Sequence, residues 1–268
     1  DPAGNIVRVS TDSFPSATNF HFISNMFLSN DRVGVTGVTN YSQANSTSWV
    51  MDTNGTTIWD TINIGVQGRD LYIDNTGNTY ILTWESASSL ADVLLYKYDA
   101  MGSLLWTQQY DLGGYDISSK IRSCYDGNLV IMAYSTTTGG SNYVDWQTVK
   151  VDTSGNILWQ DRYNEHAQND EIPNDITTDN RGNTFVTGIG GPFPGGSTLS
   201  ARQMVTVKYN STGIREWVSA LDTINEYMTG VNVVKDMIAV CLFWETLTHS
   251  LFTTSITQAA IRVVYQQV

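Results

Sequence analysis

The sequence predicts an all-β fold, a single closed five-bladed β-propeller of four-stranded antiparallel blades that takes up residues 1–268. Three observations predict it: a glycine turn that ends in tryptophan, a second glycine turn between its copies, and chain ends that together form one blade. Apolar residues make up 41% of the chain, which is enough for a sizeable core. No segment shows a helical apolar period with capping residues.

The first recurring phrase is an acidic or amide residue, two others, glycine, three others and tryptophan. Its copies are DTNGTTIW at 52–59, DAMGSLLW at 99–106, DTSGNILW at 152–159 and NSTGIREW at 210–217, with a weaker DPAGNIVR at 1–8. Repeats of about 40–50 residues are typical of four-stranded blades. The copies divide the chain into the units 1–51, 52–98, 99–151, 152–209 and 210–268. The tryptophans are predicted to pack between neighbouring blades; they are Trp59, Trp106, Trp159 and Trp217.

The second phrase is a D-x-x-G-N turn that leads into an alternating strand, as in DNTGNTYILTW at 74–84 and DNRGNTFVTG at 179–188. Glycine after aspartate or asparagine supplies the positive φ of a hairpin turn. Each unit therefore contains four strands, predicted in the fourth unit at 175–178, 184–188, 203–209 and 214–221. An open β-sandwich is the alternative, but it does not explain the tandem period.

The two ends of the chain complement each other. The last segment, IRVVYQQV at 261–268, is similar to the third strands of other units, which run directly into a D-x-x-G turn. The chain opens on such a turn, DPAG. We therefore expect residues 1–10 to supply the outer strand of the last blade and to close the ring without an open edge.

Composition argues against several classes of partner. The formal net charge is −12, whereas nucleic acids and anionic membranes attract basic surfaces. No apolar run reaches the ~20 residues of a membrane-spanning helix. Cys124 and Cys241 lie in apolar, strand-like runs and are predicted to be buried free thiols. The histidines are scattered and no metal or phosphate motif is present, so no cofactor and no metal are expected.

The two turn phrases resemble the repeats of bacterial SBBP-type β-propeller proteins, which are secreted or cell-surface proteins found often in Bacteroidetes-like bacteria. The best matches are segments 70–84, 152–159 and 175–188. The resemblance implies a propeller and an extracytoplasmic location, either secreted, periplasmic or on the cell surface of a bacterium. It does not imply one activity, because a fold does not determine a function.

The long connections of a propeller blade collect on one face, and binding residues concentrate on such loops. The sequence therefore predicts a non-catalytic binding or scaffold module that contacts a protein partner through its long-loop face. The side chains expected at that site are Tyr143, Trp146, His166, Phe193 and His249.

Four acids near the starts of first strands add to this face, where they are expected to bind and not to catalyse; they are Asp70, Asp116, Asp175 and Glu226. They recur with the repeat, which is more typical of a structural role. The alternative is a carbohydrate-binding or glycoside-processing propeller that uses these acids at its central pocket. Glycoside hydrolysis would need two carboxyl groups ~5 to ~9.5 Å apart.

Overall fold

In the computed structural model of this chain, every described element is a β-strand. The structure describes residues 21–29, 31–39, 45–85, 91–136, 143–165, 170–190, 203–221, 228–234, 239–244 and 262–264. None of these residues belongs to a helix that could cross a membrane.

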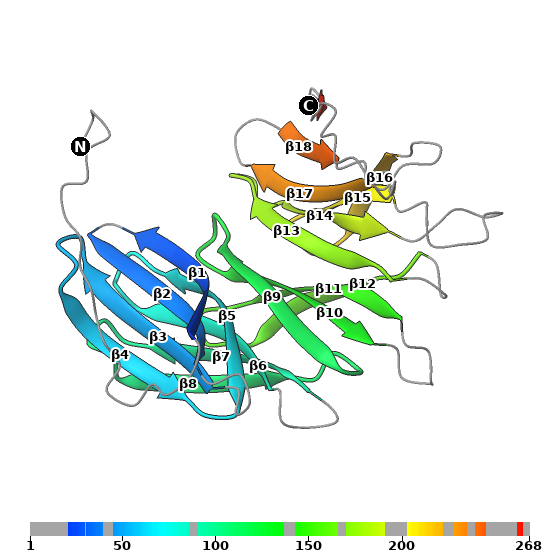
Figure 1. The fold of residues 1–268 in the computed structure, drawn as a ribbon. Helices are drawn as coiled ribbons and strands as arrows, with labels where there is room; N and C mark the ends of the chain where they lie inside the picture. Colours follow the sequence, from blue (N-terminus) through cyan, green and yellow to red (C-terminus); the bar gives the residue numbers. More distant parts are fainter. Residues whose placement is uncertain are drawn as a thin grey trace, which may run out of the picture. The chain divides into compact units, whose positions relative to one another are not determined.

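Sixteen of the strands form four sheets of four strands each (Figure 1). In every sheet the strands follow one another in sequence order and neighbours are antiparallel. The first sheet holds β1 (His21–Ser29), β2 (Arg32–Thr39), β3 (Asn45–Asp52) and β4 (Thr57–Asn63). The second holds β5 (Val66–Ile73), β6 (Thr79–Glu85), β7 (Val93–Tyr98) and β8 (Leu104–Tyr110).

The third sheet holds β9 (Asp116–Ser123), β10 (Leu129–Thr136), β11 (Val144–Val151) and β12 (Ile157–Tyr163). The fourth holds β13 (Ile172–Thr178), β14 (Thr184–Gly190), β15 (Gln203–Tyr209) and β16 (Arg215–Leu221). A tandem series of such four-stranded meanders is the architecture of propeller blades. The all-β prediction and the four strands of each complete unit are confirmed.

The prediction of five four-stranded blades needs a correction. A fifth sheet exists, but its described strands are three: β17 (Met228–Val234), β18 (Ala239–Trp244) and β19 (Arg262–Val264). Among the described residues the complete four-stranded blades thus number four, not five, and these residues form no closed sheet. Residues 1–10, which were expected to complete the last blade, lie outside the described residues.

The D-x-x-G turns form for a local reason. Asp99 Oδ1 accepts hydrogen bonds from the N–H groups of Met101 and Ser103, both at 2.9 Å. Gly102 has a φ of 86°, a conformation that glycine adopts without strain. Asp52, Asp74, Asp152, Asp179 and Asn210 make the same pair of bonds to the residues two and four positions ahead.

Tryptophans of the outer strands pack on the turn of the following sheet. Trp59 in β4 stacks on Tyr98 in β7, with ring centroids 5.4 Å apart. Trp159 in β12 stacks on Tyr209 in β15 at 5.6 Å, and its Nε1 donates to Ser211 O at 3.3 Å. The predicted packing role is confirmed for these two residues, since each joins consecutive sheets.

The chain divides into two compact units, residues 1–87 with 96–106 and residues 88–95 with 107–268. The core of the first contains Leu71, Ile73 and Ile81. The core of the second contains Val130 and Met132 and also Cys124, a buried free thiol as predicted. Burial raises the pKa of Cys124 to about 11, so the thiol is uncharged near neutral pH.

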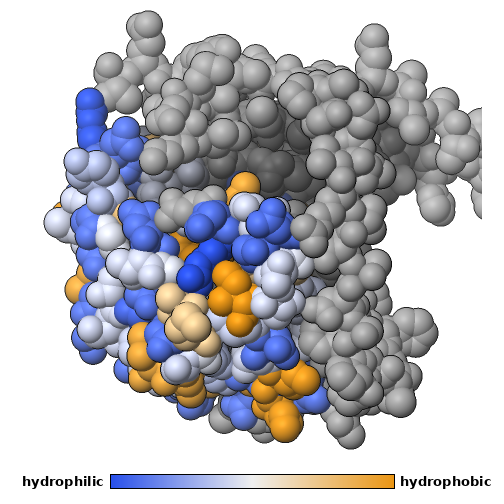
Figure 2. Space-filling view, turned by 90° about the vertical axis from the view of Figure 1, so that its left-hand side faces the viewer, coloured by the Kyte–Doolittle hydropathy of each residue, from blue (hydrophilic) through white to orange (hydrophobic). Residues whose placement is uncertain are grey.

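One face of the molecule is shown in Figure 2, where apolar residues lie in small separate groups among hydrophilic ones. Exposed apolar side chains of the described residues include Leu28, Ile64, Met101 and Leu104. Apolar residues scattered in this way are ordinary on soluble proteins. They do not by themselves indicate a binding surface.

Candidate functional site

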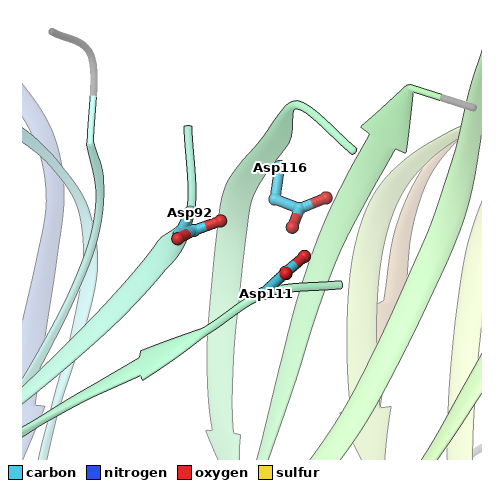
Figure 3. Close-up of side chains that lie close together, drawn as sticks. All are labelled: Asp92, Asp111 and Asp116. Carbon is cyan, nitrogen blue, oxygen red and sulfur yellow. The ribbon is translucent and has the colours of Figure 1, made fainter. Parts of the chain in front are cut away.

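Three carboxylates from different strand ends lie together, as Figure 3 shows. One oxygen each of Asp92, Asp111 and Asp116 lies within 4.8 Å of the others. Asp92 directly precedes β7, Asp111 directly follows β8 and Asp116 begins β9. Because β7 and β8 are antiparallel neighbours, the start of β7 and the end of β8 lie side by side at the same end of the sheet. The short connection 111–115 then brings the start of β9 to that end of the sheet.

Backbone hydrogen bonds hold this connection in place. Asp116 Oδ2 accepts from Leu112 N–H at 2.6 Å, and Asp116 N–H donates to Ala91 O at 2.7 Å. Asp111 Oδ1 accepts from Gly113 N–H at 2.9 Å, and Gly113 has a φ of 93°. One oxygen each of Asp111 and Asp116 is therefore held by an N–H group of the connection itself.

Asp116 is the buried member of the group, with an exposed fraction of 0%. Burial raises its pKa above the ordinary value, and the charges of Asp92 and Asp111 raise it further. The hydroxyl of Ser135 and the N–H of Leu112 act in the opposite direction. The Ser135 hydroxyl is thus near enough to act on this pKa, but it does not reach hydrogen-bond geometry, since Asp116 Oδ1 and Ser135 Oγ are both buried and neither has a hydrogen-bond partner.

Positive charge is scarce around these acids. Among the described residues, no lysine or arginine forms an ion pair with any of the three. The guanidinium of Arg162 lies on the side of Gly113, where a Cβ would meet its Nη1 at 3.9 Å, but its Nε pairs with Asp145 at 2.6 Å. Three such carboxylates can share a proton or bind a hard cation through oxygen.

The four acids predicted from the sequence do not all gather at this site. Asp116 does, whereas Asp70 lies buried in β5, where its Oδ1 accepts from Leu71 N–H at 2.8 Å. Asp175 lies in β13 and pairs with Lys120 Nζ at 2.8 Å. Glu226 is outside the described residues. The sequence analysis missed Asp92 and Asp111, because no motif links them to Asp116 and only the folded arrangement brings them together.

The aromatic residues expected on the long-loop face have different positions. Tyr143 is 38% exposed, in agreement with the expectation of an accessible side chain. Trp146 is 0% exposed, so its expected place on a binding loop is wrong. Its Nε1 donates to Ile189 O at 3.2 Å and its ring lies 4.8 Å from that of Tyr163, which makes it a core residue. His166, Phe193 and His249 are outside the described residues.

The fold resembles solved structures of a polysaccharide lyase. The PL25 ulvan lyase matches with a TM-score of 0.57 at 10% identity, over 84% of this chain and 61% of the lyase. Its complex with -[GlcA(1-4)Rha3S]- matches with a TM-score of 0.54 at 9% identity and the same coverage. At this identity the likeness shows the fold alone, and the chain spans about 61% of the length of the lyase. No curated protein sequence matches the chain.

The family model for arylsulfotransferase (ASST) matches residues 7–191. The matched residues include β1 to β14, and thus three complete sheets and half of the fourth. This finding corrects two expectations. The family that matches is not that of the SBBP-type repeats. The prediction of a non-catalytic module is wrong, because the matching family is one of enzymes. With more than half of its length matched, this chain belongs to the arylsulfotransferase (ASST) family.

Proposed function

We propose that this chain is an enzyme that transfers a sulfuryl group from an aryl sulfate ester to an acceptor hydroxyl. The observation that carries the proposal is the arylsulfotransferase match over residues 7–191. The consecutively paired sheets support it, because binding and catalytic residues concentrate on the connections of such a scaffold.

The proposed reaction needs a nucleophile and a base. The bond between sulfur and the aryl oxygen breaks, and the phenolate leaves with the electron pair. The acceptor oxygen forms the new bond to sulfur, and its proton passes to a base and then to the phenolate. Histidine can serve as either group near neutral pH. The matched residues contain His21 and His166. We assign the role of general base to His166, in the connection between β12 and β13.

The test is an assay with para-nitrophenyl sulfate as donor and phenol as acceptor. The full chain is expected to release para-nitrophenolate faster when phenol is present. His166→Asn should lower this rate by about 100-fold or more, the usual effect of losing a general base. Tyr125→Ala, at a side chain that is 76% exposed in a turn, serves as the control and should leave the rate unchanged. Absence of phenol-dependent release by the unaltered chain would refute the function, whereas an unaffected His166→Asn variant would refute only the residue assignment.

A second candidate is the processing of an acidic polysaccharide. It is favoured by the likeness to the ulvan lyase over 84% of this chain. β-Elimination beside a uronate carboxylate leaves a conjugated double bond that absorbs ultraviolet light. A rise in this absorbance on incubation with a uronate-containing polysaccharide, without any sulfate donor, would favour this candidate over sulfuryl transfer.

We also propose that the blades form a closed ring of five, with residues 1–10 beside β19. The support is the continuity of the two chain ends, in which a third strand, a turn and a fourth strand follow in order. The SBBP-like turn phrases support an extracytoplasmic location for the ring.

A further inference from the structure

The carboxylates of Asp92, Asp111 and Asp116 lack a compensating charge among the described residues. Asp92 is partly exposed, Asp111 is exposed and Asp116 is buried, so the group extends from the surface into the protein. A buried carboxylate is normally paired with a cation or with several hydrogen-bond donors. Contact with water at the surface therefore does not account for the negative charge of the buried Asp116.

A second observation concerns one atom of Asp116. The Oδ2 atom is held by the N–H of Leu112, whereas Oδ1 is buried and accepts no hydrogen bond. Figure 3 shows the Asp116 carboxylate directed toward the same space as those of Asp111 and Asp92. A buried acceptor without a donor is costly in a folded protein. Asp116 Oδ1 is therefore the oxygen at which a positively charged ligand would be stabilised most.

We propose that Asp92, Asp111 and Asp116 bind one calcium ion. Calcium takes oxygen ligands at about 2.3–2.6 Å, so two ligands on opposite sides of it are roughly 4.6–5.2 Å apart. The three oxygens lie within 4.8 Å of one another, which agrees with that span. Magnesium, at about 2.0–2.1 Å, demands near-ideal octahedral geometry and gives up its water ligands reluctantly, so it suits a site of three protein carboxylates less well. Water and backbone carbonyls would complete the coordination.

The backbone restricts how far these ligands can rearrange. Asp116 is fixed by two backbone hydrogen bonds, and the Gly113 N–H holds one oxygen of Asp111. Gln109 Nε2 donates to Asp92 Oδ2, which leaves the other oxygen of Asp92 for a cation. Oxygens held in this way suit calcium, whose coordination geometry is flexible, better than magnesium, which demands near-ideal octahedral geometry. The bound ion would tie the start of β7 and the end of β8 to the start of β9.

The proposal does not depend on sulfuryl transfer, and calcium itself is the probe. The full chain is freed of metal with a chelator, and its thermal unfolding is followed as calcium or magnesium chloride is added at constant ionic strength. We expect a saturable rise of the melting temperature with calcium and a much smaller one with magnesium, because a ligand that binds only the folded state stabilises it. Calorimetric titration should give one site.

Variants separate this site from general effects of calcium. Asp111→Asn changes an exposed member of the group and should fold normally, with calcium affinity lowered at least tenfold. Asp116→Asn should abolish the calcium-dependent rise. Asp60→Asn, an exposed acid in β4, is the control and should bind calcium like the unaltered chain. No calcium-dependent rise, an equal rise with magnesium, or a rise that persists unchanged in Asp111→Asn would overturn the proposal.

Discussion

At the scale of single residues, the turn aspartates explain most of what the repeat requires. Each one accepts hydrogen bonds from N–H groups two and four positions ahead, as Asp99 does from Met101 and Ser103. These N–H bonds lower the pKa of Asp99, because they favour the charged form. Asn210 makes the same two bonds, to Thr212 N–H at 3.0 Å and Ile214 N–H at 2.9 Å, without a titrating group.

This difference predicts a pH effect. The pKa values of Asp52, Asp99 and Asp152 are all lowered in the folded chain. A lowered folded pKa contributes stability above the unfolded value of ~3.9, and that contribution is lost as pH falls through the folded pKa. Replacing all three by Asn, as at position 210, should leave the free energy of unfolding at pH 7 nearly unchanged. Below about pH 4 the triple variant should lose less stability than the unaltered chain.

Urea unfolding of both proteins at pH 7 and pH 3 measures this. The expected result is a smaller decrease for the triple variant between the two pH values. Equal decreases would show that the turn aspartates do not contribute to the acid sensitivity of the fold.

Local interactions of this kind are readable from the sequence, and residue burial is less so. The turn pattern placed a strand at 203–209, and β15 is Gln203–Tyr209. Trp146 was misplaced because its strand position is compatible with either a loop end or the core. In the structure its ring packs against Tyr163, and its Nε1 donates to the Ile189 carbonyl of β14. That contact joins residues 43 positions apart, beyond the reach of a repeat pattern.

At the scale of elements, consecutive sheets are joined where an outer-strand tryptophan meets the next glycine turn. A Cβ on Gly102 would lie 2.7 Å from the ring of Trp59, and one on Gly213 would lie 2.5 Å from Trp159. Gly127 has a similar positive φ of 80°, but a Cβ there would meet nothing within 4 Å. Gly102 and Gly213 are therefore required both by their positive φ and by the nearby tryptophan ring, whereas Gly127 is required by its φ alone.

The pair Gly102→Ala and Gly127→Ala separates these requirements. Gly127→Ala should cost about 1–2 kcal/mol, for the left-handed conformation alone. Gly102→Ala carries the same strain and also pushes against Trp59, so it should cost about 1–3 kcal/mol more. Denaturant unfolding of both variants gives the comparison. Equal costs would mean that the Trp59 contact does not hold the two sheets together.

Only one of the three acids of the candidate site was predicted from the sequence. Asp116 was selected because it precedes a predicted strand. Asp92 and Asp111 were not, because their proximity depends on the pairing of β7 with β8 and on the path of the connection 111–115. Strand pairing brings together residues that have no shared motif, so only the three-dimensional arrangement shows the group.

At the scale of the whole molecule, we propose a closed ring and a transfer reaction. The described residues give four complete blades and a fifth of three strands. An open sheet edge in that fifth blade would be a liability, which a fourth strand from residues 1–10 would remove. The family could not be inferred from the turn phrases, because they encode the blade and not the reaction.

Deleting residues 1–10 tests the closure. If they complete the last blade, the deletion should lower the melting temperature by more than about 5 °C, since it removes the interactions of a whole strand. A matched variant in which a Gly/Ser segment of equal length replaces residues 1–10 should melt like the deletion. A melting temperature that is unchanged in both variants would contradict the closed ring.

The most direct measurement of the central claim is the identity of the acceptor after reaction. The full chain is incubated with an aryl sulfate and a phenolic acceptor, and the products are analysed by mass spectrometry. We expect a sulfated acceptor, formed in an amount equal to that of the phenol released from the donor. Release of phenol with only inorganic sulfate as the second product, or no release at all, would contradict it.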